Sequence, residues 1–190
     1  IADELISVML KNGAYMIDAD QANRLAKIVL VDKTDKKGNT RKIVNRECVG
    51  RDAKVILKKI GVNVSDDIRC IICETDFNHP FVQQELMMPI LPIVRVDNID
   101  EAIDLAVKAE HGNRHTAHMH SKNVDNLSNF AKAVETTIFV KNAPSYAGIG
   151  FGGEGHTTFT IAGPTGEGIT SARSFTRLRR CVMAENFRII

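Results

Sequence analysis

A glutamate that stands just before a proline-containing strand is a candidate binding residue. Glu85 lies four residues before Pro89, and Pro92 follows in the same run. The proline rings fix φ and so favour an extended entry into a strand. A carboxylate held there can accept two hydrogen bonds from a vicinal diol such as a ribose. The alternative is a solvated helix residue, and the local pattern leaves both interpretations open.

Three histidines, His115, His118 and His120, cluster in one short stretch. His118 and His120 are two residues apart, so they share one face of a strand. A metal site would need a further carboxylate or cysteine ligand, and none accompanies them nearby in the sequence. We therefore predict no metal site.

The chain has four cysteines, Cys48, Cys70, Cys73 and Cys181. They are too few and too irregularly spaced for a disulfide scaffold, which favours free thiols in a reducing compartment. Cys70 and Cys73 form a C-x-x-C pair inside a β-rich run. Residues three apart in a strand point to opposite faces, so these two sulfurs cannot hold one metal ion. We interpret them as buried structural thiols.

Residues 147–155 contain five glycines, and Gly148, Gly150 and Gly153 match the pattern G-x-G-x-x-G. A dinucleotide fingerprint needs a helix directly after it, whereas 156–161 is β-rich, so we favour a flexible loop that lines a site. A second glycine-containing loop at 163–170 has the spacing of a phosphate loop. Ile169 occupies the position of its essential lysine, which excludes that interpretation.

Several elements must position these residues. Apolar periodicity predicts helices over 1–11, 21–30, 52–60, 100–110 and 123–133, with Asp20 as the cap of the second. Strands are expected over 69–74, 90–96, 116–120 and 136–140, and an exposed lysine-rich loop over 32–41. Interleaved strands and helices indicate an α/β fold with an open, mostly parallel sheet and helices on both faces. The alternating segment 175–183 predicts an edge strand that pairs with another subunit.

Composition narrows the class of protein. In 190 residues, Lys plus Arg number 25 against 23 Asp plus Glu, a balance of +2 that disfavours nucleic acid as the main partner. The longest apolar runs fall far short of the roughly 20 residues that a membrane helix needs. The first residues lack the features of a signal peptide, so we expect a cytoplasmic protein. Because the chain opens on Ile1, inside an amphipathic pattern, we also expect it to be part of a longer polypeptide.

The segment Glu85-x-x-x-Pro89-x-Leu-Pro-x-x-Arg-Val resembles the E-x-F-G-P-V-L-P segment of the aldehyde dehydrogenase superfamily, with Met87 in place of the usual Phe and Met88 in place of Gly. Those departures, together with 136–142, 153–171 and 175–181, resemble the CoA-acylating branch. The likeness is greatest to the propionaldehyde and acetaldehyde dehydrogenases of bacterial microcompartments, and it runs over essentially the whole chain.

The resemblance implies the reaction of a small aldehyde with CoA and NAD⁺ to give acyl-CoA and NADH through a cysteine thioester. The family's nucleophilic cysteine lies a short distance upstream of the helix at 1–11, and no cysteine of this chain matches it. It follows that 1–173 corresponds to the catalytic domain beyond the nucleophile and that the amino-terminal NAD-binding domain is absent. We expect the 190 residues to be inactive by themselves.

The resemblance also assigns residues. Glu85 matches the carboxylate that holds the nicotinamide ribose, and His115 matches a histidine that assists thiol chemistry, with a structural strand-edge histidine as the alternative. Gly148, Gly150, Phe151 and His156 belong to the loop that borders the aldehyde pocket. Residues 174–190 match the strand and tail through which the family forms homo-oligomers.

Two other functions stay open at this stage. One is a non-catalytic assembly module that pairs subunits through its terminal strand. The other is the hydrolytic branch, in which water replaces CoA. A microcompartment shell is a further candidate partner that the resemblance brings with it.

Overall fold

The computed structural model describes residues 1–153, 161–162 and 168–182. The chain divides into two compact units, Ile1–Asn98 and Ile99–Ile190, here unit 1 and unit 2. The helices of the described residues are all too short or too polar to cross a membrane.

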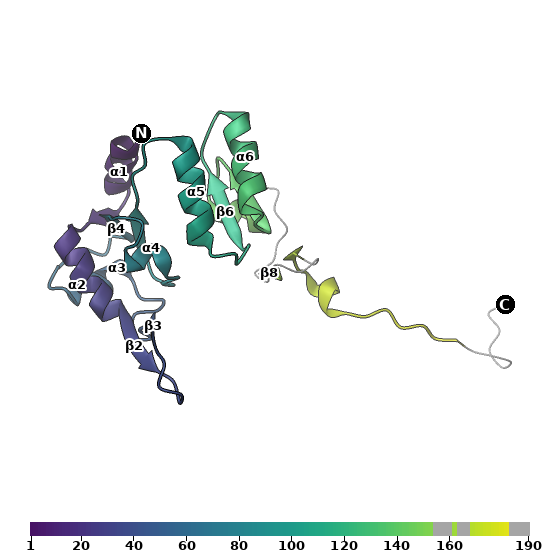
Figure 1. Ribbon diagram of the computed structural model, residues 1–190, viewed down its shortest axis with the longest axis horizontal. Coiled ribbons are helices and arrows are strands. Elements are labelled where there is room, and N and C mark those ends of the chain that lie inside the picture. The colour runs from purple at the N-terminus through teal and green to yellow at the C-terminus, as the bar shows by residue number, and fades with distance from the viewer. Residues whose placement is uncertain (154–160, 163–167, 183–190) are drawn as a thin grey trace. The chain divides into compact units, whose positions relative to one another are not determined.

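Unit 1 is built on a parallel three-stranded sheet with the strand order β1-β4-β5 (Figure 1). Ile71 of β4 lies opposite Ile90 of β5, and Ile72 lies opposite Met16 of β1. The elements of the unit, in chain order, are α1 (Ala2–Lys11), β1 (Ala14–Met16), α2 (Ala19–Val29), β2 (Leu30–Thr34), β3 (Thr40–Val44), α3 (Ala53–Lys58), β4 (Cys70–Glu74), α4 (Pro80–Gln83) and β5 (Ile90–Ile93).

Helices cover both faces of this sheet, as the interleaved order of elements predicts. Ile71 and Cys73 point into a core that α2 and α3 complete with Leu25, Val29, Ile56 and Leu57. On the opposite face, Ile72 packs with Ile6 of α1 and Ala14 of β1. Cys70 belongs to this second face, so the prediction that the two cysteines of the C-x-x-C pair point apart is confirmed.

The second helix begins earlier than expected. Asp18, not Asp20, is its N-cap: its carboxylate accepts a hydrogen bond from the Gln21 backbone N–H at 2.7 Å. The Gln21 side chain accepts one in return from the Asp18 N–H at 3.0 Å, which completes a capping box. The sequence offers two candidate caps, Asp18 and Asp20. Only a helix that begins after Asp18 has Gln21 at its third position, where its side chain can complete the capping box.

The lysine-rich stretch expected as a loop is instead an antiparallel hairpin of β2 and β3, which extends away from the rest of unit 1 in Figure 1. Thr34 and Thr40 face each other with their hydroxyl oxygens 2.9 Å apart. Asp35 ties the turn, because its carboxylate accepts backbone N–H bonds from Lys37 and Asn39. Away from its base, at 32–34 and 40–42, the side chains of the hairpin are polar and exposed, so the apolar alternation that marks a strand is missing from this part of the sequence.

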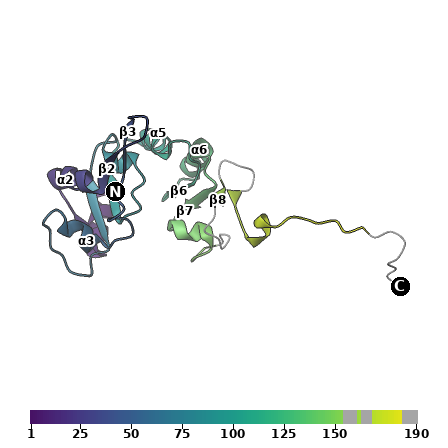
Figure 2. The ribbon, with the colours of Figure 1, turned by 90° about the horizontal axis from the view of Figure 1, so that it is seen from below.

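Unit 2 contains a parallel pair of strands, β6 and β7, covered on both sides. Phe139 of β7 meets Phe130 of α6 edge-on, with ring centroids 5.5 Å apart. Ile138 and Val140 point to the other face, where Ala147 of η1 packs on them; Figure 2 shows α6 and η1 on either side of the pair. The elements of the unit are α5 (Ile99–Glu110), β6 (Thr116–Met119), α6 (Val124–Val134), β7 (Ile138–Lys141), η1 (Ser145–Ile149), β8 (Ile161–Ala162), β9 (Gly168–Ile169) and η2 (Ala172–Phe175).

The terminal segment differs from the expected edge strand. Phe175 ends a 3₁₀ turn, and residues 176–182 follow without regular secondary structure or a strand partner among the described residues. Leu178 and Val182 are largely exposed there. The last expected strand residue, Met183, lies outside the described part of the chain.

Candidate functional site

Glu85 lies in the short connection between α4 and β5. The residue is exposed, and among the described residues its carboxylate has no hydrogen-bond or ion-pair partner. Its neighbours are anchored instead, since Phe81 and Leu86 are both buried in the core of unit 1. A carboxylate with free lone pairs on a fixed backbone fits the binding of a sugar diol.

Residues that follow Glu85 in this connection line a groove with a volume of about 740 Å³. Met87, Met88 and Pro89 are among the residues that line the groove, whereas Glu85 is not. Met87 has a φ of +52°, a strained value for a residue with a side chain, and its carbonyl accepts a hydrogen bond from the Gly50 N–H. The charged side chains that line the groove are Arg51, Asp52, Lys54, Asp66 and Arg69.

His79 is the N-cap of α4. The sequence alone had not indicated a role for this residue. Its Nδ1 accepts a hydrogen bond from the Phe81 backbone N–H at 3.2 Å, and Pro80 occupies the first helical position. Burial lowers the pKa of His79, while the nearby Asp76 acts in the opposite direction. A capping histidine followed by proline is the signal that sequence inspection could have used.

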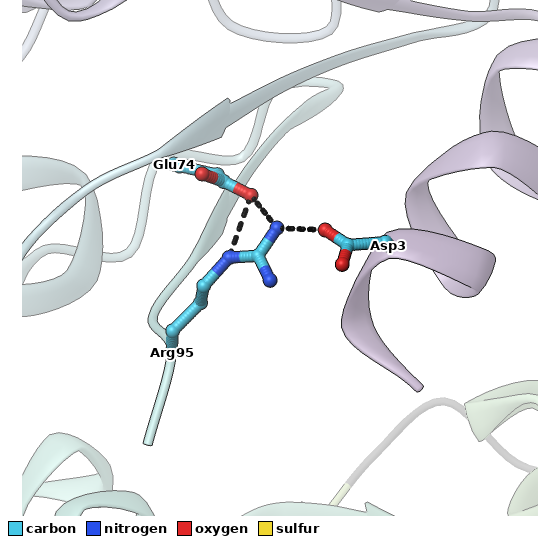
Figure 3. A network of polar contacts seen from close by, with 3 residues as sticks. All are labelled: Asp3, Glu74 and Arg95. Carbon is cyan, nitrogen blue, oxygen red and sulfur yellow. Dashed lines mark hydrogen bonds and ion pairs between the residues drawn. The ribbon is translucent and has the colours of Figure 1, made fainter. Parts of the chain in front are cut away.

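Arg95 joins three elements at one end of the sheet. Its guanidinium donates to Glu74 at the end of β4 and to Asp3 in the first turn of α1, as Figure 3 shows. The Nε–H bond to the Glu74 carboxylate measures 2.9 Å. Hydrogen bonds from Arg95 lower the pKa of the Asp3 carboxyl group. The network thus connects the beginning of α1 to the end of β4 and to the residues just after β5.

In unit 2, His115 stands directly before β6 and is exposed. Its ring Nδ1 lies 2.7 Å from the Thr116 hydroxyl oxygen. Its backbone is fixed at both ends, because the N–H donates to the Glu110 carboxylate and the carbonyl accepts from Ile138 of β7. The imidazole is therefore held at the edge of the β6–β7 pair with its ring open to solvent.

The other two histidines of the cluster form a pair. The rings of His118 and His120 meet edge-on with centroids 5.7 Å apart, which confirms that they share one face. His118 also pairs with Ser145 of η1, with its Nδ1 3.2 Å from the hydroxyl oxygen. Burial and the neighbouring His120 lower the pKa of His118. Both histidines border an apolar cavity of about 310 Å³ between α5, β6 and α6.

The glycine-rich segment begins as a defined turn rather than as an irregular loop. Gly148 lies within η1, and a Cβ at this position would approach the Cγ2 of Ile138 to 2.3 Å and that of Val140 to 3.1 Å. Gly150 ends the turn with a φ of +93°. Phe151 is exposed and packs its ring edge-on against Tyr146. His156, also expected in this segment, lies outside the described residues.

The four thiols are free, as expected. Cys48 and Cys73 are fully buried, and burial, followed by the neighbouring Cys70, raises the pKa of Cys73 to about 11. Burial also raises the pKa of Cys70. Cys181 is exposed in the terminal segment. The shifts at Cys70 and Cys73 are opposite to those of a nucleophilic cysteine, which needs a stabilised thiolate.

The predicted site residues are thus divided between the two units. Glu85 belongs to unit 1, together with His79 and Arg95. His115 and the turn with Gly148 belong to unit 2, where both contact the β6–β7 pair.

Residues 69–179, more than half of the chain, match the aldehyde dehydrogenase family. The chain belongs to the aldehyde dehydrogenase family. It is 53% identical over its full length to the acetaldehyde dehydrogenase (acetylating) EutE of Salmonella typhimurium, of which it covers 40%. The expected α/β fold and the family resemblance are therefore confirmed.

Two solved aldehyde dehydrogenases share the fold of this chain. One is a propionaldehyde dehydrogenase from the fucose utilisation microcompartment of Clostridium phytofermentans, with 54% identity and a TM-score of 0.83. The other is the propionaldehyde dehydrogenase of Rhodopseudomonas palustris with bound CoA and an acylated cysteine, again with 54% identity and a TM-score of 0.83. Each match covers 96% of this chain and 40% of the solved one, so the chain spans about two fifths of these relatives.

Proposed function

We propose that residues 1–190 form part of a CoA-acylating aldehyde dehydrogenase that converts a short aldehyde, CoA and NAD⁺ to acyl-CoA and NADH. The observation that carries the proposal is the 54% identity to a relative with bound CoA and an acylated cysteine. The polypeptide of the relatives' length that contains these residues is called the longer enzyme below.

Glu85 is the group that we assign to the cofactor. NAD⁺ supplies the acceptor for the hydride that leaves the aldehyde carbon. The Glu85 carboxylate, which has no partner among the described residues, accepts hydrogen bonds from the ribose hydroxyls next to the nicotinamide. Holding that sugar fixes the ring for hydride transfer, which is where a positioning interaction lowers the barrier.

His115 is the group that we assign to the second half-reaction. A neutral imidazole has one ring nitrogen that carries no proton and can accept one from a thiol. His115 can therefore take the proton from the incoming CoA thiol as its sulfur attacks the thioester. The Thr116 hydroxyl, 2.7 Å from Nδ1, orients the ring for this step.

The attacking cysteine comes from outside residues 1–190 in this proposal. Cys48 is buried, and burial raises the pKa values of Cys70 and Cys73, which disfavours their thiolates. Cys181 lies in the terminal segment, in sequence surroundings that do not match the nucleophile of the family. A relative carries its acyl group on a cysteine, which supports thioester chemistry for the longer enzyme.

The cellular setting is proposed from the same relatives. We propose a cytoplasmic enzyme that uses NAD⁺ and forms homo-oligomers through residues 174–190. One solved relative comes from a microcompartment, which supports enclosure in such a shell. The turn with Gly148, Gly150 and Phe151, followed by His156, borders the aldehyde pocket in this proposal.

Product analysis of the longer enzyme tests the proposed reaction. With propanal and NAD⁺, we expect acyl-CoA to accumulate in step with NADH when CoA is present. Without CoA, we expect a single turnover of NADH and little free acid. Steady production of the free carboxylic acid that does not depend on CoA would overturn the proposal and favour the hydrolytic branch.

A further inference from the structure

The connection that carries Glu85 starts from a single histidine. His79 Nδ1 accepts the Phe81 N–H, and the His79 carbonyl accepts the N–H groups of Val82 at 2.9 Å and Gln83 at 3.3 Å. The His79 ring also packs edge-on against Phe81, with ring centroids 4.8 Å apart. Side chain and backbone of His79 thus both determine where α4 begins.

The cap requires one particular state of the imidazole. Nδ1 can accept a hydrogen bond only when it carries no proton, so the ring is neutral with its proton on Nε2. Nε2 is buried and has no hydrogen-bond partner among the described residues. Burial disfavours the charged form of the ring and lowers its pKa, against the opposing effect of Asp76. The hydrogen bond to Nδ1 and the burial of the ring therefore both favour the neutral tautomer.

The position of α4 determines the position of Glu85. The helix has only four residues, so a single cap satisfies a large share of its free N–H groups. Its last turn is closed by the Gln84 N–H, which donates to the Pro80 carbonyl at 3.1 Å. Phe81 within the helix and Leu86 after Glu85 are buried in the same core. Glu85 lies between these anchors, and among the described residues its side chain makes no hydrogen bond or ion pair that would correct a shift.

We propose that His79, as a neutral N-cap, is a positioning residue for the Glu85 carboxylate and thereby for the ribose of the nicotinamide cofactor. The inference rests on the proposed function, because it needs Glu85 to hold that ribose. It adds a residue that does not touch the cofactor and acts through the backbone of 80–85. If His79 has this role, the affinity for the cofactor should depend on whether the side chain at position 79 can cap α4, and not on the size or polarity of that side chain.

A matched pair of substitutions in the longer enzyme tests the proposal. In His79→Asn the amide oxygen takes the place of Nδ1 and can cap, whereas in His79→Gln the amide lies near the place of Nε2 and cannot. We expect His79→Gln to raise the KM for NAD⁺ about fivefold, the scale of a lost helix cap, and to leave the KM for CoA unchanged. We expect His79→Asn to stay within about twofold of the wild type.

Two further variants are controls. His111→Asn makes the same change at an exposed histidine of unit 2 and should leave all constants unchanged. Glu85→Gln reports whether the carboxylate binds the cofactor at all. Thermal melting of each variant separates lost cofactor binding from lost folding. If His79→Gln does not fold, His79→Ser is measured instead. Because serine can cap the helix with its hydroxyl, this variant should behave as His79→Asn does.

Each outcome has a distinct meaning. An equal rise in the KM for NAD⁺ in the Asn and Gln variants, or no rise in the folded Gln variant, would overturn the role of His79. With His79→Ser in place of Gln, a KM for NAD⁺ more than about twofold above that of the wild type would overturn it as well. A longer enzyme in which Glu85→Gln leaves cofactor binding intact would instead overturn the proposed function on which the inference rests.

Discussion

At the scale of single residues, the groups assigned to chemistry are placed by their backbone. Glu85 has no side-chain partner among the described residues, and it is fixed by the buried Phe81 and Leu86 on either side. His115 is held through its N–H and carbonyl while its ring stays exposed. The sequence shows the residue types but not these supports, which come from contacts between distant elements.

Replacing Glu85 by Gln should weaken the use of the cofactor. The substitution keeps the size of the side chain but removes its charge and one of its two acceptor oxygens. We expect the KM for NAD⁺ of the longer enzyme to rise about tenfold, the scale of a lost charge-assisted hydrogen bond. Steady-state kinetics with NAD⁺ varied at saturating aldehyde and CoA measure this. Glu4→Gln on the exposed part of α1 is the control, and equal constants for both variants would remove Glu85 from the site.

Replacing His115 by Ala should separate the two half-reactions. We expect acyl transfer to CoA to slow by about a hundredfold, the lower range of general base catalysis, with hydride transfer nearly unchanged. Stopped-flow measurement of the first NADH turnover, followed by quenched-flow measurement of acyl-CoA, distinguishes the two steps. His120→Ala serves as a control from the same cluster. Equal slowing of both steps by His115→Ala would indicate a structural histidine.

At the scale of elements, the sequence predicted those helices and strands whose apolar residues recur with a regular period. The alternation at Cys70 and Cys73 placed the two thiols on opposite faces of β4, as found. The β2–β3 hairpin was missed because its side chains at 32–34 and 40–42 are all polar. The helix α4 was missed because four residues carry no period, although Pro80 at its first position was a signal in the sequence.

The packing of η1 on β7 leads to a prediction about Gly148. Any side chain there meets the branched Cγ2 atoms of Ile138 and Val140, which are buried in β7 and cannot easily move. We expect Gly148→Ala to destabilise the chain by about 1–3 kcal/mol, the usual cost of overpacking. Urea unfolding followed by far-UV circular dichroism measures it. Lys141→Ala, an exposed change at the end of β7, is the control, and an unchanged midpoint for Gly148→Ala would contradict the close packing of η1 on β7.

At the scale of the whole molecule, the family assignment extends across both units, since the match to the aldehyde dehydrogenase family runs from residue 69 to residue 179. The sequence alone supported that assignment because motifs such as Glu85 to Pro92 are long and specific. Glu85 and His115, to which we assign the cofactor and the CoA thiol, lie in different units, and the chain covers 40% of a solved relative. The proposed function therefore depends on a nucleophile from another part of the longer enzyme.

Mapping the acylated cysteine tests this dependence most directly. The longer enzyme is incubated with propanal and NAD⁺ but without CoA, so that the acyl group stays on the enzyme, and its peptides are then identified by mass spectrometry. We predict one acylated cysteine, located outside residues 1–190, and release of its acyl group when CoA is added. An acyl group on Cys48, Cys70, Cys73 or Cys181 that CoA removes would contradict this prediction.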